Sequence, residues 1–217
     1  MKIKITTASP DALNHDTLIL GFFSDERPPR GYCGLVDWRL NGMISNAIAG
    51  GRISGIFLVK LACAFPERIR VARLLLFGLG ALSELTYDKL YNAGYEMART
   101  VIGIGATDLA LPVPAAGRGP LNLDGMTEAL LTGIFDGFGR APEKLPTVIL
   151  EIPGEPDHTR DTRRGVDLFR QHAGGADIEI LSPGDRTADI TDTPGDEDSD
   201  KKISGAMHGQ KVQPVGD

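Results

Sequence analysis

The sequence predicts an α/β fold in which a mostly parallel or mixed sheet is covered by helices on both faces, a three-layer α/β/α arrangement. Leu74–Phe77 is an unbroken apolar run, too short for a helix and without a polar face, as in a strand covered on both sides. The run ends in a Gly-Leu-Gly turn at 78–80, and a helical pattern opens at about Ser83. Strand, turn and helix in this order form the repeating unit of doubly covered sheets.

The elements before this strand are predicted from periodicity and turn residues. Thr17–Phe23 is apolar and strand-like, and the paired prolines within Ser24–Gly31 indicate a loop because proline removes backbone donors. Apolar residues at helical spacing predict one helix over about 36–49, stopped by two glycines. Residues 55–65 alternate as a strand, and Lys60 on one face places that strand near a sheet edge.

The elements after the central strand continue the alternation of helix and strand. The clearest helix runs from Ser83 to about Thr100, with Ser83 or Thr86 as its cap. Tyr87, Tyr91 and Tyr95 share one face of this helix, where packing against a neighbouring element is favoured over a stacking platform for a ligand. The remaining predictions are strands within 108–113, 147–152 and 176–181, and helices over 122–138 and 159–172.

Composition and charge limit the function classes. Of the 217 residues 41 % are hydrophobic, no apolar run reaches the ~18–20 residues of a membrane span, and the start lacks the apolar segment of a signal peptide, so we expect a cytoplasmic protein that does not bind membranes. Residues 1–150 hold 15 Lys and Arg against 14 Asp and Glu, whereas residues 151–217 hold 8 against 15. Because there is no basic stripe, we expect no nucleic-acid binding.

The acidic excess belongs to the end of the chain. Residues 183–217 show no apolar periodicity and carry a run of acidic residues, which predicts a disordered acidic tail after a single domain over 1–182. The acidic run lacks the spaced ligands of a calcium loop. The two cysteines, Cys33 and Cys63, do not form a C-x-x-C pair, so buried thiols are expected.

The order of motifs resembles the N-terminal, non-catalytic domain of the cytosol (leucyl) aminopeptidase family, which has a macro-domain-like α/β fold. The matching segments are Asp16–Phe23, the helix around Ile44, Arg73–Gly80 with the helix that follows it, and Ala129–Phe138. Together they cover about residues 16–150. The resemblance implies a macro-like module.

The sequence departs from that family where the family carries its chemistry. The enzymes hold two divalent metals in a second domain, marked by a Gly-Lys-Gly-led stretch and by Asn-Thr-Asp-Ala-Glu-Gly-Arg, and neither occurs here. A two-metal peptidase needs several carboxylates converging on two ions. We therefore expect no peptidase activity from this chain, no catalytic residue, no metal site and no cofactor; the four histidines share no metal-ligand spacing.

Three glycine-rich turns are the candidate ligand sites. Gly78, Gly80 and Ser83 open a helix whose backbone N–H groups could bind an anion, although a structural turn explains the same glycines. If the macro-like fold holds, the turn at Gly103 and Gly105 and the loop carrying Arg118 face the same cleft, where Arg118 would meet a phosphate.

These observations favour a stand-alone binding or regulatory module whose partner is a small nucleotide-type anion or another protein. Two alternatives stay open: a subunit or relic of a metal-dependent aminopeptidase that acts with a separate catalytic chain, and a hydrolase of ADP-ribose-like compounds. Self-association into a homo-oligomer is also compatible with the sequence.

Overall fold

Among the residues that the structure describes, seven strands form one mixed sheet, in the order β3 (Lys60–Ala64), β4 (Val71–Gly78), β2 (His15–Phe22), β5 (Asp108–Ala110), β6 (Ile149–Pro153), β1 (Lys2–Thr6) and β7 (Glu179–Leu181). The computed structural model describes residues 1–174 and 178–181. All neighbouring strands pair in parallel except β3 and β4, which are antiparallel.

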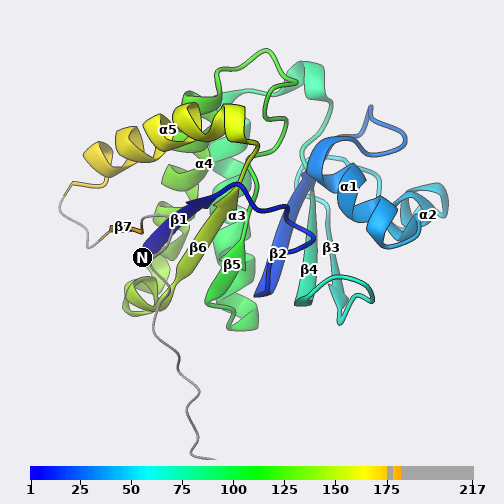
Figure 1. Cartoon of the computed structure of the whole chain (residues 1–217), viewed down its shortest axis with the longest axis horizontal. Coiled ribbons are helices and arrows are strands. Elements are labelled where there is room, and N and C mark those ends of the chain that lie inside the picture. The colour runs from blue at the N-terminus through cyan, green and yellow to red at the C-terminus, as the bar shows by residue number, and fades with distance from the viewer. Residues whose placement is uncertain (175–177, 182–217) are drawn as a thin grey trace, which may run out of the picture. The chain divides into compact units, whose positions relative to one another are not determined.

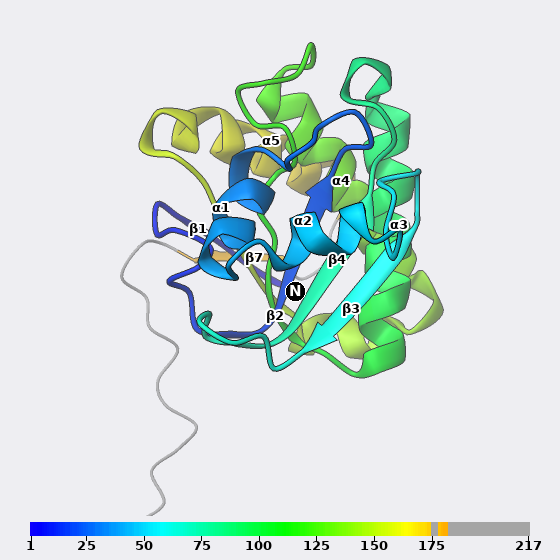
Figure 2. The same cartoon turned by 90° about the vertical axis from the view of Figure 1, so that its right-hand side faces the viewer.

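Helices cover both faces of the sheet, which confirms the predicted three-layer α/β fold (Figures 1 and 2). One face of β2 and β4 packs against α1 and α2, and the opposite face of the sheet packs against α3, α4 and α5. The helices are α1 (Gly31–Arg39), α2 (Met43–Ala49), α3 (Tyr87–Ile104), α4 (Leu123–Gly137) and α5 (Thr159–His172).

Strand β4 is enclosed on both faces, as its apolar run predicts. Leu74 and Leu76 belong to the core under α1 and α2, whereas Leu75 and Phe77 belong to the core under α3 and α4. The predicted edge position of the preceding strand is also confirmed, because β3 is the terminal strand beside β4. Its Lys60 Nζ lies 2.9 Å from a Glu96 carboxylate oxygen on α3.

The opening residues form a strand that the sequence interpretation missed. The first element predicted from the sequence begins at Thr17, yet Lys2–Thr6 forms β1, which lies between β6 and β7 in the sheet. Ile3 and Ile5 alternate with polar residues and are buried. The period-two signal spans only five residues, so it is weak in the sequence but sufficient once β6 supplies a parallel partner.

The expectation of one helix over residues 36–49 is wrong: two helices form there, α1, which begins earlier at Gly31, and α2, which begins at Met43. Asn41 and Gly42 have φ values of 56° and 77°, in the left-handed region that ends a helix. Asp37 stabilises the break, because its carboxylate accepts hydrogen bonds from the backbone N–H groups of Ile44 and Ser45 at 2.7 and 3.0 Å. A buried aspartate of α1 therefore caps α2.

Helix α3 packs closely on α4 along the face that carries the three tyrosines. Tyr91 donates its hydroxyl hydrogen to Asp136 of α4 at 2.8 Å, and the Tyr87 hydroxyl accepts from the backbone N–H of Asn122 at 3.2 Å. These contacts support the packing interpretation of the tyrosines. Close approach requires Gly133, where an added β-carbon would lie 2.0 Å from the backbone oxygen of Tyr91.

Two glycine-to-alanine substitutions should therefore change stability in opposite directions. Gly133→Ala should lower the free energy of unfolding by about 1–3 kcal/mol, because the backbone of α3 must move away. Gly103→Ala should raise it by about 0.5 kcal/mol, since Gly103 is helical and a β-carbon there meets nothing within 4 Å. Urea denaturation followed by circular dichroism measures both, and an unchanged Gly133→Ala protein would contradict the close packing of α3 on α4.

The acidic tail predicted for 183–217 lies outside the described residues. The predicted strand over 176–181 is described in part, as β7. Within residues 1–174 and 178–181, no helix combines the length and the apolar character that crossing a bilayer requires.

Candidate ligand-binding cavity

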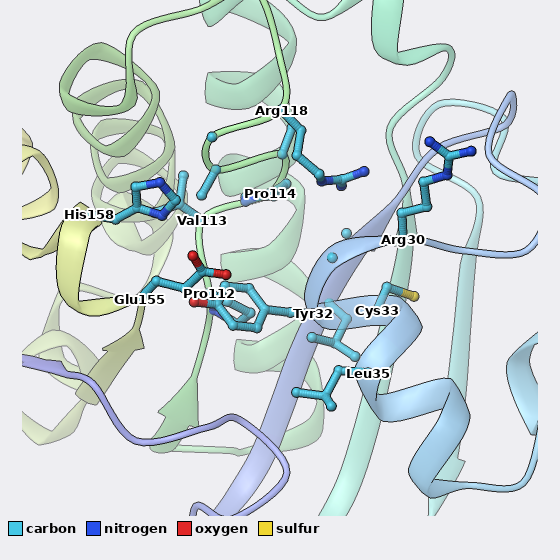
Figure 3. Close-up of a pocket in the computed structure, with 16 residues that line it drawn as sticks. Arg30, Tyr32, Cys33, Leu35, Pro112, Val113, Pro114, Arg118, Glu155 and His158 are labelled. Atoms are coloured by element: carbon cyan, nitrogen blue, oxygen red, sulfur yellow. The ribbon is translucent and has the colours of Figure 1, made fainter.

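A cavity of about 400 Å³ opens at the carboxyl ends of the parallel strands β2, β5 and β6 (Figure 3). Four segments line it: residues 20–21 of β2, residues 30–35 at the start of α1, the loop 112–118 after β5, and Glu155 with His158 after β6. Ligands of open α/β sheets bind at this end of the strands, because the loops there converge while the sheet holds them in place. The topology of the sheet therefore places four segments that are far apart in the sequence around one cavity.

The α1 side of the cavity carries positive charge. Arg118 forms an ion pair with Glu26, and its side chain is 28 % exposed. Its guanidinium lies against Gly31, where an added β-carbon would come within 3.1 Å of Arg118 Nη2. Gly31 is the first residue of α1, and no side chain caps this helix start, so its N–H groups add partial positive charge beside Arg118.

The β6 side of the cavity carries hydrogen-bond acceptors. Figure 3 shows Tyr32 and Glu155 close together, while the Arg30 side chain extends away from them. Burial and the neighbouring Glu155 carboxylate raise the pKa of the Tyr32 hydroxyl, so it stays protonated and can donate a hydrogen bond. The two sides of the cavity therefore offer different chemistry: a guanidinium and helix N–H groups toward α1, and a carboxylate with a tyrosine hydroxyl toward β6.

His158 contributes a buried nitrogen without a partner among the described residues. Its Nδ1 atom is inaccessible to solvent and makes no hydrogen bond. Its ring lies against Gly117, where an added β-carbon would be 2.8 Å from Nε2. Gly117 has a φ of 70°, so both its conformation and the space it leaves for the imidazole require glycine.

Cys33 lines the cavity but is not suited to nucleophilic chemistry. Burial, with the carboxylates of Asp37 and Glu26, raises the pKa of its thiol to about 12. The thiolate, which is the reactive form, is therefore scarce at neutral pH. Among residues 1–174 and 178–181 no three His, Cys, Asp or Glu side chains are grouped so that they could hold a metal ion.

Only Arg118 of the six predicted site residues lines this cavity. Gly78, Gly80 and Ser83 follow β4 instead, and the Gly80 N–H, expected to be free for an anion, donates to the Gly55 carbonyl at 2.9 Å. An added β-carbon at Gly78 would lie 2.2 Å from the Ile56 carbonyl oxygen, so the strand end is covered by the preceding loop.

The expectation that three glycine-rich turns face one cleft needs correction. Gly103 lies in the last turn of α3 and Gly105 caps that helix. Because α3 returns along the sheet from the carboxyl end of β4, its own C-terminus lies near the start of β5, at the opposite end of the strands. Gly105 borders a different, smaller cavity with Phe138 and Lys144.

Sequence reasoning missed Tyr32, Glu155 and His158. Tyr32 falls between the loop predicted to end at Gly31 and the helix predicted to begin at about residue 36. Glu155 and His158 fall between the strand predicted to end at residue 152 and the helix predicted to begin at Thr159. A usable signal was the rule that ligands bind where parallel strands end, which selects the residues directly after β5 and β6.

The fold and cavity define a macro-domain-like α/β module, and the comparisons identify its family. Residues 19–138 match the family model "Cytosol aminopeptidase family, N-terminal domain". The match covers more than half of the chain, so this chain belongs to the cytosol aminopeptidase family through that N-terminal domain.

Individual relatives agree with this assignment. A probable cytosol aminopeptidase of Cyanothece sp. (strain PCC 7425 / ATCC 29141) is 24 % identical over 190 residues, which are 88 % of this chain and 34 % of the relative, so the chain spans about a third of that protein's length. A mutant of tomato leucine aminopeptidase superimposes with a TM-score of 0.54 at 18 % identity, over 76 % of this chain and 35 % of the tomato chain. The Trypanosoma brucei macrodomain in complex with ADP-ribose has a TM-score of 0.62 at 12 % identity, over 76 % of this chain and 68 % of the macrodomain.

Proposed function

We propose that this aminopeptidase N-terminal module binds a small, nucleotide-type anion in the cavity at the ends of β2, β5 and β6, and acts by binding rather than by peptide hydrolysis. The observation that carries the proposal is the convergence of the α1 start, Arg118 and the 112–118 loop on one cavity. Helix starts and arginine side chains are the usual partners of phosphate groups.

The size and polarity of the cavity suit such a ligand. Its volume of about 400 Å³ lies within the ~300–1,000 Å³ typical of small-molecule sites. A phosphate would lie toward Arg118 and the α1 start, whereas Glu155 and Tyr32 on the other side can bind hydroxyl groups of a sugar. The likeness in fold to a macrodomain whose structure contains ADP-ribose supports this class of ligand.

Thermal unfolding in the presence of ligands tests the proposal. ADP or ADP-ribose at 100 times its dissociation constant should stabilise the protein by about 2.7 kcal/mol, which raises the melting temperature by roughly 5–10 °C. Ala116→Trp places an indole in the cavity and should remove this shift, because Ala116 lines the cavity wall. Ala12→Trp is the matched control, since Ala12 is exposed and does not line the cavity.

The same experiment separates the alternatives. Consumption of ADP-ribose during the titration, lost in Ala116→Trp, would favour a hydrolase. A wild-type protein that no nucleotide stabilises would contradict the proposal and favour the second candidate, a subunit of a metal-dependent aminopeptidase. Family membership is the observation behind that candidate, and the two metals would then be held by a separate catalytic chain.

A further inference from the structure

Loop 23–30, between β2 and α1, directs two carboxylates at positions that would otherwise attract an anion. Asp25 accepts hydrogen bonds from the backbone N–H of Leu82, at 2.9 and 3.1 Å from its two oxygens, at the turn after β4. The next residue, Glu26, forms the ion pair with Arg118. The Leu82 amide and the Arg118 guanidinium are therefore both already paired with carboxylates of the chain itself.

Glu26 is held firmly in this arrangement. Its side chain is 9 % exposed and it does not line the cavity, whereas its partner Arg118 does. A buried carboxylate of this kind is stable only while it is paired, so Glu26 and Arg118 neutralise each other beneath the cavity.

We propose that Glu26 is a built-in competitor for Arg118, which limits the affinity of the cavity for phosphate groups. The inference rests on the proposed function and adds which residue limits the affinity of the cavity for its ligand. A phosphate entering the cavity must either share the guanidinium with Glu26, and be repelled by its carboxylate, or displace it. Both routes weaken anion binding, so removal of the Glu26 charge should strengthen it.

The substitution Glu26→Gln isolates the charge from the geometry. Glutamine has the same shape and keeps an acceptor oxygen for the Arg118 fork, so the guanidinium stays in place. Asp157→Asn is the matched control: it removes one negative charge from an exposed residue of the same loop as His158, which neither lines the cavity nor touches the Arg118 ion pair. Its effect should be small, because screened charges that are not in contact interact weakly.

Isothermal titration calorimetry, in which inorganic pyrophosphate is added to the whole chain, tests the inference. Glu26→Gln should bind at least about tenfold more tightly than the wild type, Asp157→Asn at most about threefold more tightly, and the double variant Glu26→Gln with Arg118→Gln should lose the gain. Equal or weaker binding by Glu26→Gln, or an equal gain in Asp157→Asn, would overturn the competitor role. If Glu26→Gln does not fold, Glu26→Asp draws the carboxylate back from Arg118 and should show a smaller gain.

The outcomes also separate this inference from the proposed function. A wild type that binds nucleotides beside an unchanged Glu26→Gln variant would remove only the competitor role. A wild type that binds neither nucleotide nor pyrophosphate, beside a Glu26→Gln variant that binds pyrophosphate, would support the competitor role and remove only the proposed function. Absence of binding in both proteins would overturn both.

Discussion

Leu75→Ala should lower the free energy of unfolding by about 2–5 kcal/mol, through lost burial and the cavity left behind. Leu75 is 3 % exposed and lies in β4, with Ile19 of β2 on one side and Ala62 of β3 on the other. Its side chain points into the core beneath α3 and α4. Neighbouring backbone on both sides and helices above leave little room for the site to collapse around a smaller residue.

Equilibrium urea unfolding measures this loss. Ile56→Ala is the control, because Ile56 is also a large aliphatic residue but is 61 % exposed, and it should cost less than about 1 kcal/mol. A loss below about 1 kcal/mol for Leu75→Ala would contradict the enclosure of β4 on both faces.

The strands and helices with strong local signals could be predicted from the sequence. The uniform apolar run of β4 and the alternation around β3 led to the correct strand types, and α5 was predicted with its observed bounds. Errors arose where a non-local partner decides the structure. Strand β1 needs β6 beside it, and the break between α1 and α2 depends on left-handed residues and on Asp37 reaching forward to α2.

The candidate site was harder to predict than the fold because its residues are far apart in the sequence. Arg118 could be selected, since a lone arginine between glycines is conspicuous. Tyr32, Glu155 and His158 carry no local motif, and only the parallel register of β2, β5 and β6 brings their loops together. The Gly-Leu-Gly turn after β4 is a common strand ending, and in the fold the Gly78 and Gly80 amides donate to the carbonyls of Val59 and Gly55 instead of facing a cavity.

A charged network near the amino-terminal ends of the strands is the basis for a second prediction, a large loss of stability when His15 is replaced. His15 at the start of β2 contacts Asp108 of β5, with 2.6 Å from Nδ1 to Oδ1, and Glu151 of β6, with 3.1 Å from Nε2 to Oε2. Lys4 of β1 lies 3.1 Å from the same Glu151 oxygen. The side chains of His15 and Glu151 are 9 % and 6 % exposed, whereas those of Asp108 and Lys4 are 41 % and 32 % exposed. The network therefore joins four strands, with its His15–Glu151 centre shielded from water and its ends open to it.

The imidazolium form of His15 is favoured in the folded protein. Burial by itself would lower the pKa of His15, but hydrogen bonds to Asp108 and Glu151 outweigh it and raise the pKa from 6.5 to about 9. Burial would likewise raise the pKa of Glu151, but hydrogen bonds from His15 and Lys4 outweigh it and leave that pKa lowered. Both shifts favour the charged pair, so the pair stabilises the fold at neutral pH.

His15→Gln should therefore lower the free energy of unfolding by about 3 kcal/mol at pH 6, at the low end for breaking a buried ion pair because Lys4 still contacts Glu151. Since the folded pKa of His15 is raised, its contribution is complete below about pH 6.5 and disappears as the pH rises through about 9. The difference in the free energy of unfolding between wild type and variant should accordingly shrink at pH 10.

His172→Gln is the matched control, because His172 also pairs with a carboxylate, Glu128 at 2.7 Å, but its side chain is 68 % exposed. This substitution should lower the free energy of unfolding by less than about 1 kcal/mol. Urea unfolding at pH 6, 8 and 10 measures both variants, and a His15→Gln loss that stays constant across this range would show that His15 acts by packing and not by its charge.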